Sequence, residues 1–115
     1  MRKIAIFALN GDSMYFIHVL LNALDMANKG FSVKLIIEGN ATALLNKLAD
    51  PGAQLAQLYN KVKEQGLIDC VCNACAEKTG SIDSAREQDL PLCAEMKGHP
   101  SMARYMDEGY EIITF

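Results

Sequence analysis

The cysteines are the residues of this chain best suited to chemistry, and three of the four lie in one short segment. Cys72 follows an apolar run and precedes a helical pattern, so it stands where a strand ends and a helix begins. Free backbone N–H groups and the helix dipole at such a position favour a thiolate. The Cys-x-x-Cys spacing of Cys72 and Cys75 can lower a thiol pKa from about 8.5 to about 3.5–7.5. Because the thiolate is the nucleophilic form of sulfur, the sequence predicts Cys72 as the reactive cysteine.

The same cysteines allow other chemistries, which the sequence leaves open. Cys72 and Cys75 can form a disulfide with each other. Cys70 and Cys72 are poorer partners, because two residues along a strand separate by about 6.6 Å, near the upper limit of ~6.8 Å between disulfide Cα atoms. Structural zinc takes four ligands, and the possible set is Cys70, Cys72, Cys75 and Cys93, although two separated Cys-x-x-Cys pairs are absent. Cys70 lies deeper in the strand and is interpreted as a small buried apolar side chain.

Four polar positions complete the candidate site. The backbone N–H groups of Asn73 and Ala74 are expected to stabilise a sulfur anion on Cys72. His99 precedes a proline that suits the first position of a helix, so it is expected at the N-cap, where it can orient a substrate or act as an acid or base. A simple turn role for His99 is the competing interpretation. Asn10 follows the first apolar run and is a candidate substrate contact.

These residues need a scaffold, and the pattern of the chain predicts an α/β sandwich around a parallel sheet of four to five strands. Buried strands are expected at residues 3–9, 31–38, 67–72, 92–96 and 110–115, and helices at 13–29, 40–48, 55–65, 73–79 and 100–108. The polar stretch 81–90 is either a helix or an ordered loop. All 115 residues are assigned to one domain, 1–115.

The first helix carries two apolar lines at helical spacing. The first is expected to face the core and consists of Ile17, Leu20, Leu21 and Leu24. The second consists of Tyr15, Val19, Asn22 and Met26. It is explained either by a core packed on both sides of the helix or by a subunit interface, and the interface is the preferred interpretation.

In open α/β sheets, ligands gather at the carboxyl ends of the strands. That rule selects residues 10–14, 38–40, 72–75 and 97–100. A nucleotide site with Glu38 as the ribose-binding acid is disfavoured, because Gly11 stands alone where dinucleotide binding needs Gly-x-Gly-x-x-Gly.

The composition excludes further classes of protein. The net charge of -3 argues against non-specific nucleic-acid binding. No apolar stretch is long enough to span a membrane, and the apolar run after Lys3 is shorter than the ~7–15 residues of a signal peptide. We therefore expect a cytoplasmic protein, in which cysteines are more often catalytic, metal-binding or buried than joined in structural disulfides.

With these motifs in order, the chain resembles the DsrE/DsrF-like family of small intracellular sulfur-transfer proteins. The resemblance covers essentially the whole chain and rests on segments 3–9, 27–31, 38–39, 72–80 and 98–115. It implies a three-layer α/β/α sandwich with strand order 4-3-2-1-5, and assembly into dimers, trimers or hexamers, in some relatives with a paralogous subunit. It also implies that Cys72 accepts sulfur from a donor protein as a persulfide and passes it to an acceptor protein, without a cofactor.

The sequence and this resemblance lead to three candidate functions. The first is a persulfide carrier, sulfurtransferase-like if active, in which Cys75 releases the sulfur by forming a disulfide with Cys72. It predicts that Cys72→Ser abolishes persulfide loading, whereas Cys93→Ser leaves loading intact. The second is a non-catalytic oligomeric module whose cysteines bind zinc or sense redox state. The third is a regulator that binds a nucleotide or phosphate at residues 10–14.

Overall fold

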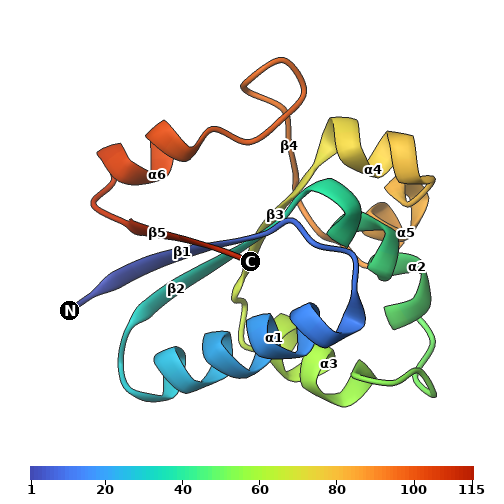
Figure 1. Cartoon of the computed structure of the whole chain (residues 1–115), viewed down its shortest axis with the longest axis horizontal. Helices are drawn as coiled ribbons and strands as arrows, with labels where there is room; N and C mark the ends of the chain where they lie inside the picture. Colours follow the sequence, from blue (N-terminus) through green and yellow to red (C-terminus); the bar gives the residue numbers. More distant parts are fainter.

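The computed structural model describes residues 1–115 and contains a five-stranded sheet with helices on both faces (Figure 1). The elements, in chain order, are β1 (Lys3–Ala8), α1 (Ser13–Asn28), β2 (Ser32–Ile37), the 3₁₀ helix η1 (Gly39–Ala43), α2 (Leu44–Leu48), α3 (Ala56–Glu64), β3 (Ile68–Cys72), α4 (Asn73–Thr79), α5 (Ile82–Glu87), β4 (Leu92–Cys93), α6 (Met102–Asp107) and β5 (Glu111–Thr114).

The sheet confirms the expected topology. Its strands are all parallel and follow the order β4-β3-β2-β1-β5. The inner strand β1 is apolar along almost its whole length, since Ile4 to Ala8 are all buried, as expected of a strand covered on both faces. The carboxyl ends of β2 and β3 therefore meet at one edge of the sheet, where Glu38 and Cys72 lie.

The hydrophobic cores on the two faces of the sheet differ in size. Alternate residues of β1, such as Ile4 and Ile6, join a core of 22 buried residues that includes α1, α2 and α3. The intervening residues Ala5 and Phe7 join a core of only seven, which Tyr105 of α6 covers. Figure 1 shows α6 on the opposite side of the sheet from α1 and α3. One layer of the sandwich is thus a single short helix with its flanking loop.

The predicted inward face of α1 is wrong by about one residue around the helix. The buried residues are Phe16, Val19, Leu20 and Ala23. Leu21 is 45% exposed, although it was expected in the core, and Val19 is buried, although it was expected at an interface. The two apolar lines of this helix lie side by side, so hydrophobic periodicity alone could not decide which one faces the sheet.

Several element boundaries also differ from the prediction. Asn40 lies inside η1 and does not cap a helix. The strand expected over residues 92–96 is the two-residue β4, and the stretch 81–90 contains α5. The last helix begins at Met102, and its N-cap is Ser101, whose hydroxyl accepts a hydrogen bond from the N–H of Arg104. His99 therefore belongs to the preceding loop.

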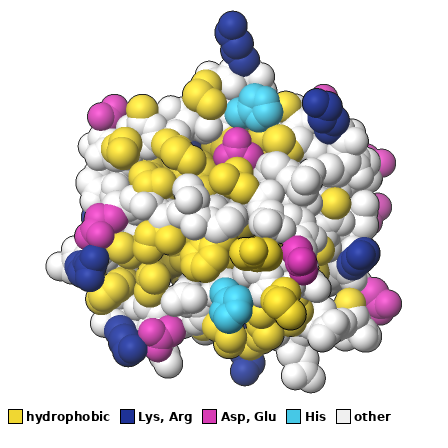
Figure 2. All heavy atoms as spheres, in the orientation of Figure 1, with side chains coloured by type: hydrophobic (Ala, Val, Ile, Leu, Met, Phe, Trp, Pro, Cys, Tyr) yellow, Lys and Arg dark blue, Asp and Glu magenta, His cyan; other side chains and the backbone are white.

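Several large hydrophobic side chains remain exposed. They include Met14, Tyr15 and Leu21 on α1, and Met96, Met102 and Met106 in or near α6. Figure 2 shows hydrophobic side chains gathered in bands on one face of the molecule. None of the helices combines the length and the apolar character needed to cross a membrane.

Candidate functional site

Cys72 is the last residue of β3 and the N-cap of α4, as the sequence predicts. Its side chain is buried, and the next cysteine, Cys75, lies in the first turn of α4 with partial exposure. Both thiols are free. The strand fixes the direction of Cys72, and the helix turns Cys75 back toward it, so one thiol is buried and the other faces solvent.

The other two cysteines form a disulfide, which the sequence analysis did not predict. Cys70 on β3 and Cys93 on β4 are joined, with their Cα atoms 5.8 Å apart. They meet because β3 and β4 are neighbours in the sheet, with Cys72 in register with Cys93. The disulfide divides the four cysteines into two pairs, so the structure has no single cluster of Cys70, Cys72, Cys75 and Cys93. Cys70 is buried, as predicted, but as half of a disulfide and not as a free thiol.

His99 reaches the free thiols from a tight turn. Met96 and His99 exchange two backbone hydrogen bonds, of 2.8 and 3.0 Å, around the central residues Lys97 and Gly98. Both central residues have positive φ, +50° and +94°, as a type I′ hairpin turn requires. The Gly98 carbonyl accepts a hydrogen bond of 2.9 Å from the N–H of Ala74, which ties the turn to α4.

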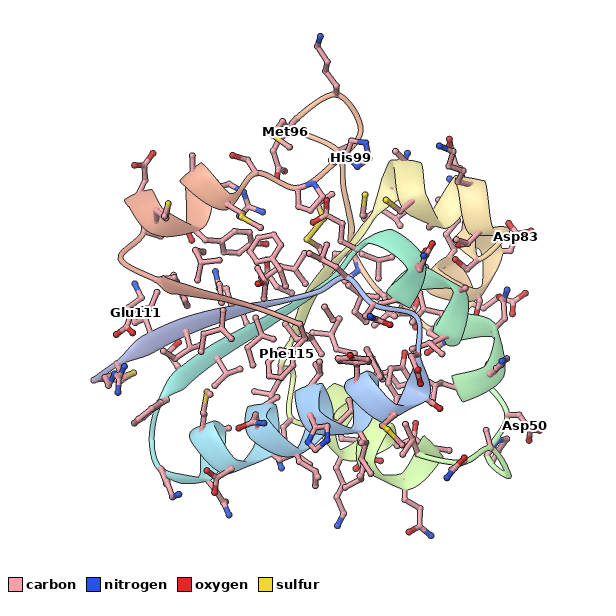
Figure 3. All side chains as sticks on the ribbon, viewed as in Figure 1. Asp50, Asp83, Met96, His99, Glu111 and Phe115 are labelled. Carbon is pink, nitrogen blue, oxygen red and sulfur yellow. A yellow bond between two sulfur atoms is a disulfide. The ribbon has the colours of Figure 1, made fainter.

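Four side chains converge beside this turn (Figure 3 labels His99). The Nδ1 atom of His99 lies 3.1 Å from the Cys72 sulfur and 3.7 Å from the Cys75 sulfur. Glu38, directly after β2, places Oε2 3.9 Å from the same nitrogen. The Cys72, Cys75 and Glu38 side chains therefore all lie near the same nitrogen of the His99 ring. A depression lined by Ala74, Cys75, Glu77, Lys78 and His99 opens this cluster to solvent.

The electrostatics of Cys72 differ from the expectation of a lowered pKa. Burial raises the pKa of Cys72 to about 12, while the backbone N–H of Cys75 opposes the rise, and Cys75 and Glu38 add to it. Burial likewise raises the pKa of Glu38, and His99 opposes that rise. Cys72 is thus a thiol at neutral pH, because the cost of desolvating the thiolate outweighs the one backbone N–H that favours it.

The remaining predicted residues have mixed outcomes. The N–H of Ala74 is not available to a sulfur anion, because it donates to Gly98. The N–H of Cys75 takes the role expected of its neighbours. The side chain of Asn73 extends toward Glu77, 3.5 Å away. Asn10 accepts a hydrogen bond from the N–H of Asp12 in a turn before α1, with no contact to the thiols.

Glu38 is the site residue that sequence reasoning misjudged. The sequence placed residues 38–40 at the ligand-binding edge of the sheet, together with 72–75 and 97–100, but it gave Glu38 itself a role only in a nucleotide site, which was then set aside. Its place after β2, the strand next to β3, could have marked it as a neighbour of Cys72. Its closeness to His99 depends on the hairpin turn, for which only the Lys-Gly pair gives a signal.

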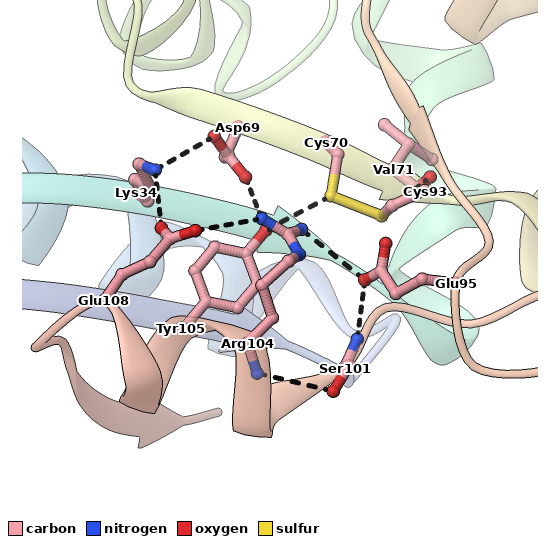
Figure 4. A network of polar contacts seen from close by, with 10 residues as sticks. All are labelled: Lys34, Asp69, Cys70, Val71, Cys93, Glu95, Ser101, Arg104, Tyr105 and Glu108. Atoms are coloured by element: carbon pink, nitrogen blue, oxygen red, sulfur yellow. Dashed lines mark hydrogen bonds and ion pairs between the residues drawn. A yellow bond between two sulfur atoms is a disulfide. The ribbon is translucent and has the colours of Figure 1, made fainter.

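A second polar network holds the loop that carries His99 (Figure 4). The Glu95 carboxylate accepts a hydrogen bond of 2.8 Å from the N–H of Ser101 and lies 3.5 Å from Arg104. The Tyr105 hydroxyl donates to Asp69 on β3 and accepts from Arg104 at 2.9 Å. The network fixes α6 on the thin face of the sheet, so both ends of the loop with His99 are anchored.

Comparison with known proteins identifies relatives for the whole chain. The model of the DsrE/DsrF-like family matches residues 3–115. The chain is 34% identical over 96 residues to the uncharacterized protein MJ0733 of Methanocaldococcus jannaschii, which covers 84% of this chain and 76% of that protein. It is 41% identical over 49 residues to an uncharacterized protein of Archaeoglobus fulgidus, which covers 43% of this chain and 80% of that protein.

Two solved structures share the fold. The structure of MTH1491, a protein of unknown function from Methanobacterium thermoautotrophicum, matches with a TM-score of 0.73 and 15% identity over 100% of both chains. The structure of BT1422, a conserved protein of unknown function from Bacteroides thetaiotaomicron, matches with a TM-score of 0.67 and 17% identity over 98% of this chain and 94% of that one. At these identities the two structures are evidence for the fold alone.

Proposed function

This chain belongs to the DsrE/DsrF-like family, which suggests a role of the sulfur-relay type, and on that premise we propose that it is a persulfide carrier that accepts sulfur on Cys72. The observation that carries the proposal is the contact of 3.1 Å between the Cys72 sulfur and Nδ1 of His99. A buried thiol with a raised pKa needs a base to become a nucleophile, and an adjacent imidazole is such a base.

The proposed loading step is a thiol–persulfide exchange. Nδ1 of neutral His99 takes the Cys72 proton, and the thiolate attacks the outer sulfur of a donor persulfide. A new S–S bond forms on Cys72, the donor S–S bond breaks, and the donor leaves as a thiolate that takes up the proton. No oxidant or reductant is consumed. The Glu38 carboxylate, 3.9 Å from Nδ1, stabilises the imidazolium through its charge.

Cys75 offers a route for release. Its sulfur lies within 4.8 Å of the Cys72 sulfur and is partly exposed. A Cys75 thiolate that attacks the inner sulfur of the Cys72 persulfide forms a Cys72–Cys75 disulfide and expels hydrosulfide, and a thiol reductant then restores both thiols. Direct attack by an acceptor thiolate on the outer sulfur is the other route, and it regenerates the Cys72 thiol at once.

The test is persulfide loading from glutathione persulfide, followed with a persulfide-specific tag. We expect wild type to load, Cys72→Ser to fail and Cys75→Ser to retain its persulfide longer, because its release by disulfide formation is lost. Since Cys93→Ser alone would free the Cys70 thiol, the matched control is the double variant Cys70→Ser with Cys93→Ser, which should load normally. Loading that survives Cys72→Ser would contradict the proposal.

The partners follow from the same proposal. A carrier without a bound cofactor needs a donor protein and an acceptor protein, and both must approach the depression beside Cys75 and His99. We also propose self-association through the exposed apolar face of α1, which includes Tyr15 and Leu21. Tyr15→Glu should then reduce the molar mass measured by light scattering.

A further inference from the structure

The cluster beside the hairpin turn holds more donor atoms than sulfur exchange needs. Two sulfur atoms, one ring nitrogen and one carboxylate oxygen converge from four segments of the chain, namely β3, α4, the loop before α6 and the residue after β2. The sulfur atoms of Cys72 and Cys75 and the ring nitrogen of His99 all lie within 4.8 Å of one another. Such a convergence of unlike donors on one point is the arrangement that a metal ion requires.

The spacing of the donors fits a tetrahedral ion. With metal–sulfur bonds of ~2.3 Å and metal–nitrogen bonds of ~2.0 Å, neighbouring donor atoms of a tetrahedron lie roughly 3.3–3.8 Å apart. The corresponding distances from Nδ1 of His99 are 3.1 Å to Cys72, 3.7 Å to Cys75 and 3.9 Å to Glu38. Adjustments of a few tenths of an ångström would bring the Cys72, Cys75 and His99 donors, which all lie within 4.8 Å of one another, onto one centre. Glu38 lies outside that group of three, and its carboxylate would move farther, from 3.9 Å beside Nδ1, to become the fourth ligand.

The backbone holds the donors in place independently of a ligand. The hydrogen bond of 2.9 Å from the N–H of Ala74 to the Gly98 carbonyl fixes the turn against α4. A donor set positioned in this way loses little conformational freedom on binding, which favours affinity. Partial exposure of Cys75 and His99 leaves an entry path through the depression that they line.

The donor types select the ion. We propose that the Cys72, Cys75, His99 and Glu38 side chains bind one Zn²⁺ ion in this protein. Two thiolates, an imidazole and a carboxylate are all accepted zinc ligands. An iron–sulfur cluster prefers four thiolates, and the other two cysteines are committed to a disulfide. Cu⁺ is selected by soft thiolate and thioether donors, so it would gain little from the carboxylate.

Binding would change the protonation and the reactivity of the site. Cys72 and Cys75 each lose a proton to solvent, and the neutral His99 ring binds through Nδ1 while its proton resides on Nε2. A Cys72 thiolate that is bound to zinc shares its lone pair with the metal and is not free to attack a persulfide. Zinc and sulfur acceptance therefore compete for Cys72.

The test uses the full chain, freed of metal with a chelator under nitrogen. Cobalt, a spectroscopic substitute for zinc, is titrated first, and zinc then competes against a chromogenic chelator. We expect one ion per chain, a thiolate-to-cobalt charge-transfer band and loss of that band on addition of zinc. His99→Ala and Cys75→Ser should weaken zinc binding roughly 10–100-fold or more, and Glu38→Gln about tenfold.

The matched control is His18→Ala, which removes an exposed histidine of α1 and should leave zinc affinity unchanged, and circular dichroism verifies that each variant is folded. Sub-stoichiometric binding, a cobalt spectrum without the thiolate band, or affinity unchanged in His99→Ala would overturn the zinc site. Unchanged affinity in Glu38→Gln would overturn its place as the fourth ligand. No sulfur donor is present, so failure of persulfide loading would leave this result untouched.

Discussion

Two properties of Cys72 act on its reactivity in opposite directions. Burial favours the neutral thiol and raises its pKa to about 12. The His99 nitrogen at 3.1 Å, in contrast, can accept the proton of the thiol. The resting thiol resists unspecific oxidation, since the thiolate is the form that oxidants attack. Chemistry at Cys72 then depends on proton transfer within the site.

The charge of Glu38 is the most direct way to change this balance. In Glu38→Gln the negative charge beside Cys72 is removed, so the pKa of Cys72 should fall and its alkylation by iodoacetamide at pH 8 should become severalfold faster. The measurement is the pH profile of the alkylation rate in metal-free protein that also carries Cys75→Ser and His99→Ala, so that the carboxylate acts on the thiol alone and not through the imidazolium. A profile that is the same with and without Glu38→Gln would show that the carboxylate does not influence the thiol.

At the scale of the elements, the apolar runs and their breaks predicted β1, β2, β3 and α1 well, because each is a continuous or periodic pattern closed by a glycine or a cap. Contacts between residues of different elements were harder to predict from the sequence. The disulfide of Cys70 with Cys93 requires β4 to lie beside β3, and β4 has only two residues, too few for a sequence signal. The meeting of Glu38 with His99 depends on a turn conformation that periodicity does not describe.

The turn that presents His99 depends on Gly98. Its φ of +94° is unfavourable for other residues, and a Cβ there would lie 3.0 Å from the Cβ of Ala74. Gly98→Ala should cost about 1–2 kcal/mol for the backbone and about 1 kcal/mol or more for the crowding. The matched control is Gly30→Ala, where φ is +90° and nothing lies within 4 Å. Equal losses of unfolding free energy in urea would contradict the close contact.

The disulfide is the covalent link between β3 and β4. Its residues are 23 apart in the sequence, and a closed loop of that length should stabilise the fold by about 3 kcal/mol. The double variant Cys70→Ser with Cys93→Ser should lose that amount in urea unfolding, and reduced wild type should match it. A double variant as stable as the oxidised protein would rule out a structural contribution.

At the scale of the whole molecule, two buried tyrosines set a limit on alkaline stability. Burial raises the pKa of Tyr59, and burial together with Asp69 raises the pKa of Tyr105. In the unfolded chain both hydroxyls ionise near pH 10, so the unfolded state releases protons first, and stability that is complete below about pH 10 is lost above it. The pKa of Cys72 is raised as well, so ionisation of this thiol in the unfolded chain also lowers stability at high pH.

Urea unfolding at pH 9 and pH 11 should therefore give a clearly lower unfolding free energy at the higher pH. Tyr59→Phe removes one of the ionising groups, so its loss between the two pH values should be smaller than that of wild type. Tyr15→Phe, at a tyrosine that is exposed in the single chain, serves as the control at protein concentrations where light scattering gives the monomer mass, and it should behave as wild type does. An unfolding free energy independent of pH over this range would mean that the hydroxyls are not buried in the folded protein.

The central claim, that Cys72 carries the sulfur, is tested most directly by mapping the atom itself. The protein is purified without reductant and exposed briefly to glutathione persulfide, and its intact mass and peptide fragments are measured before and after reduction. We expect the mass of one added sulfur atom, located on Cys72 and removed by reduction. Sulfur found only on another cysteine, or neither added sulfur nor a Cys72–Cys75 disulfide after exposure to the donor, would contradict the claim.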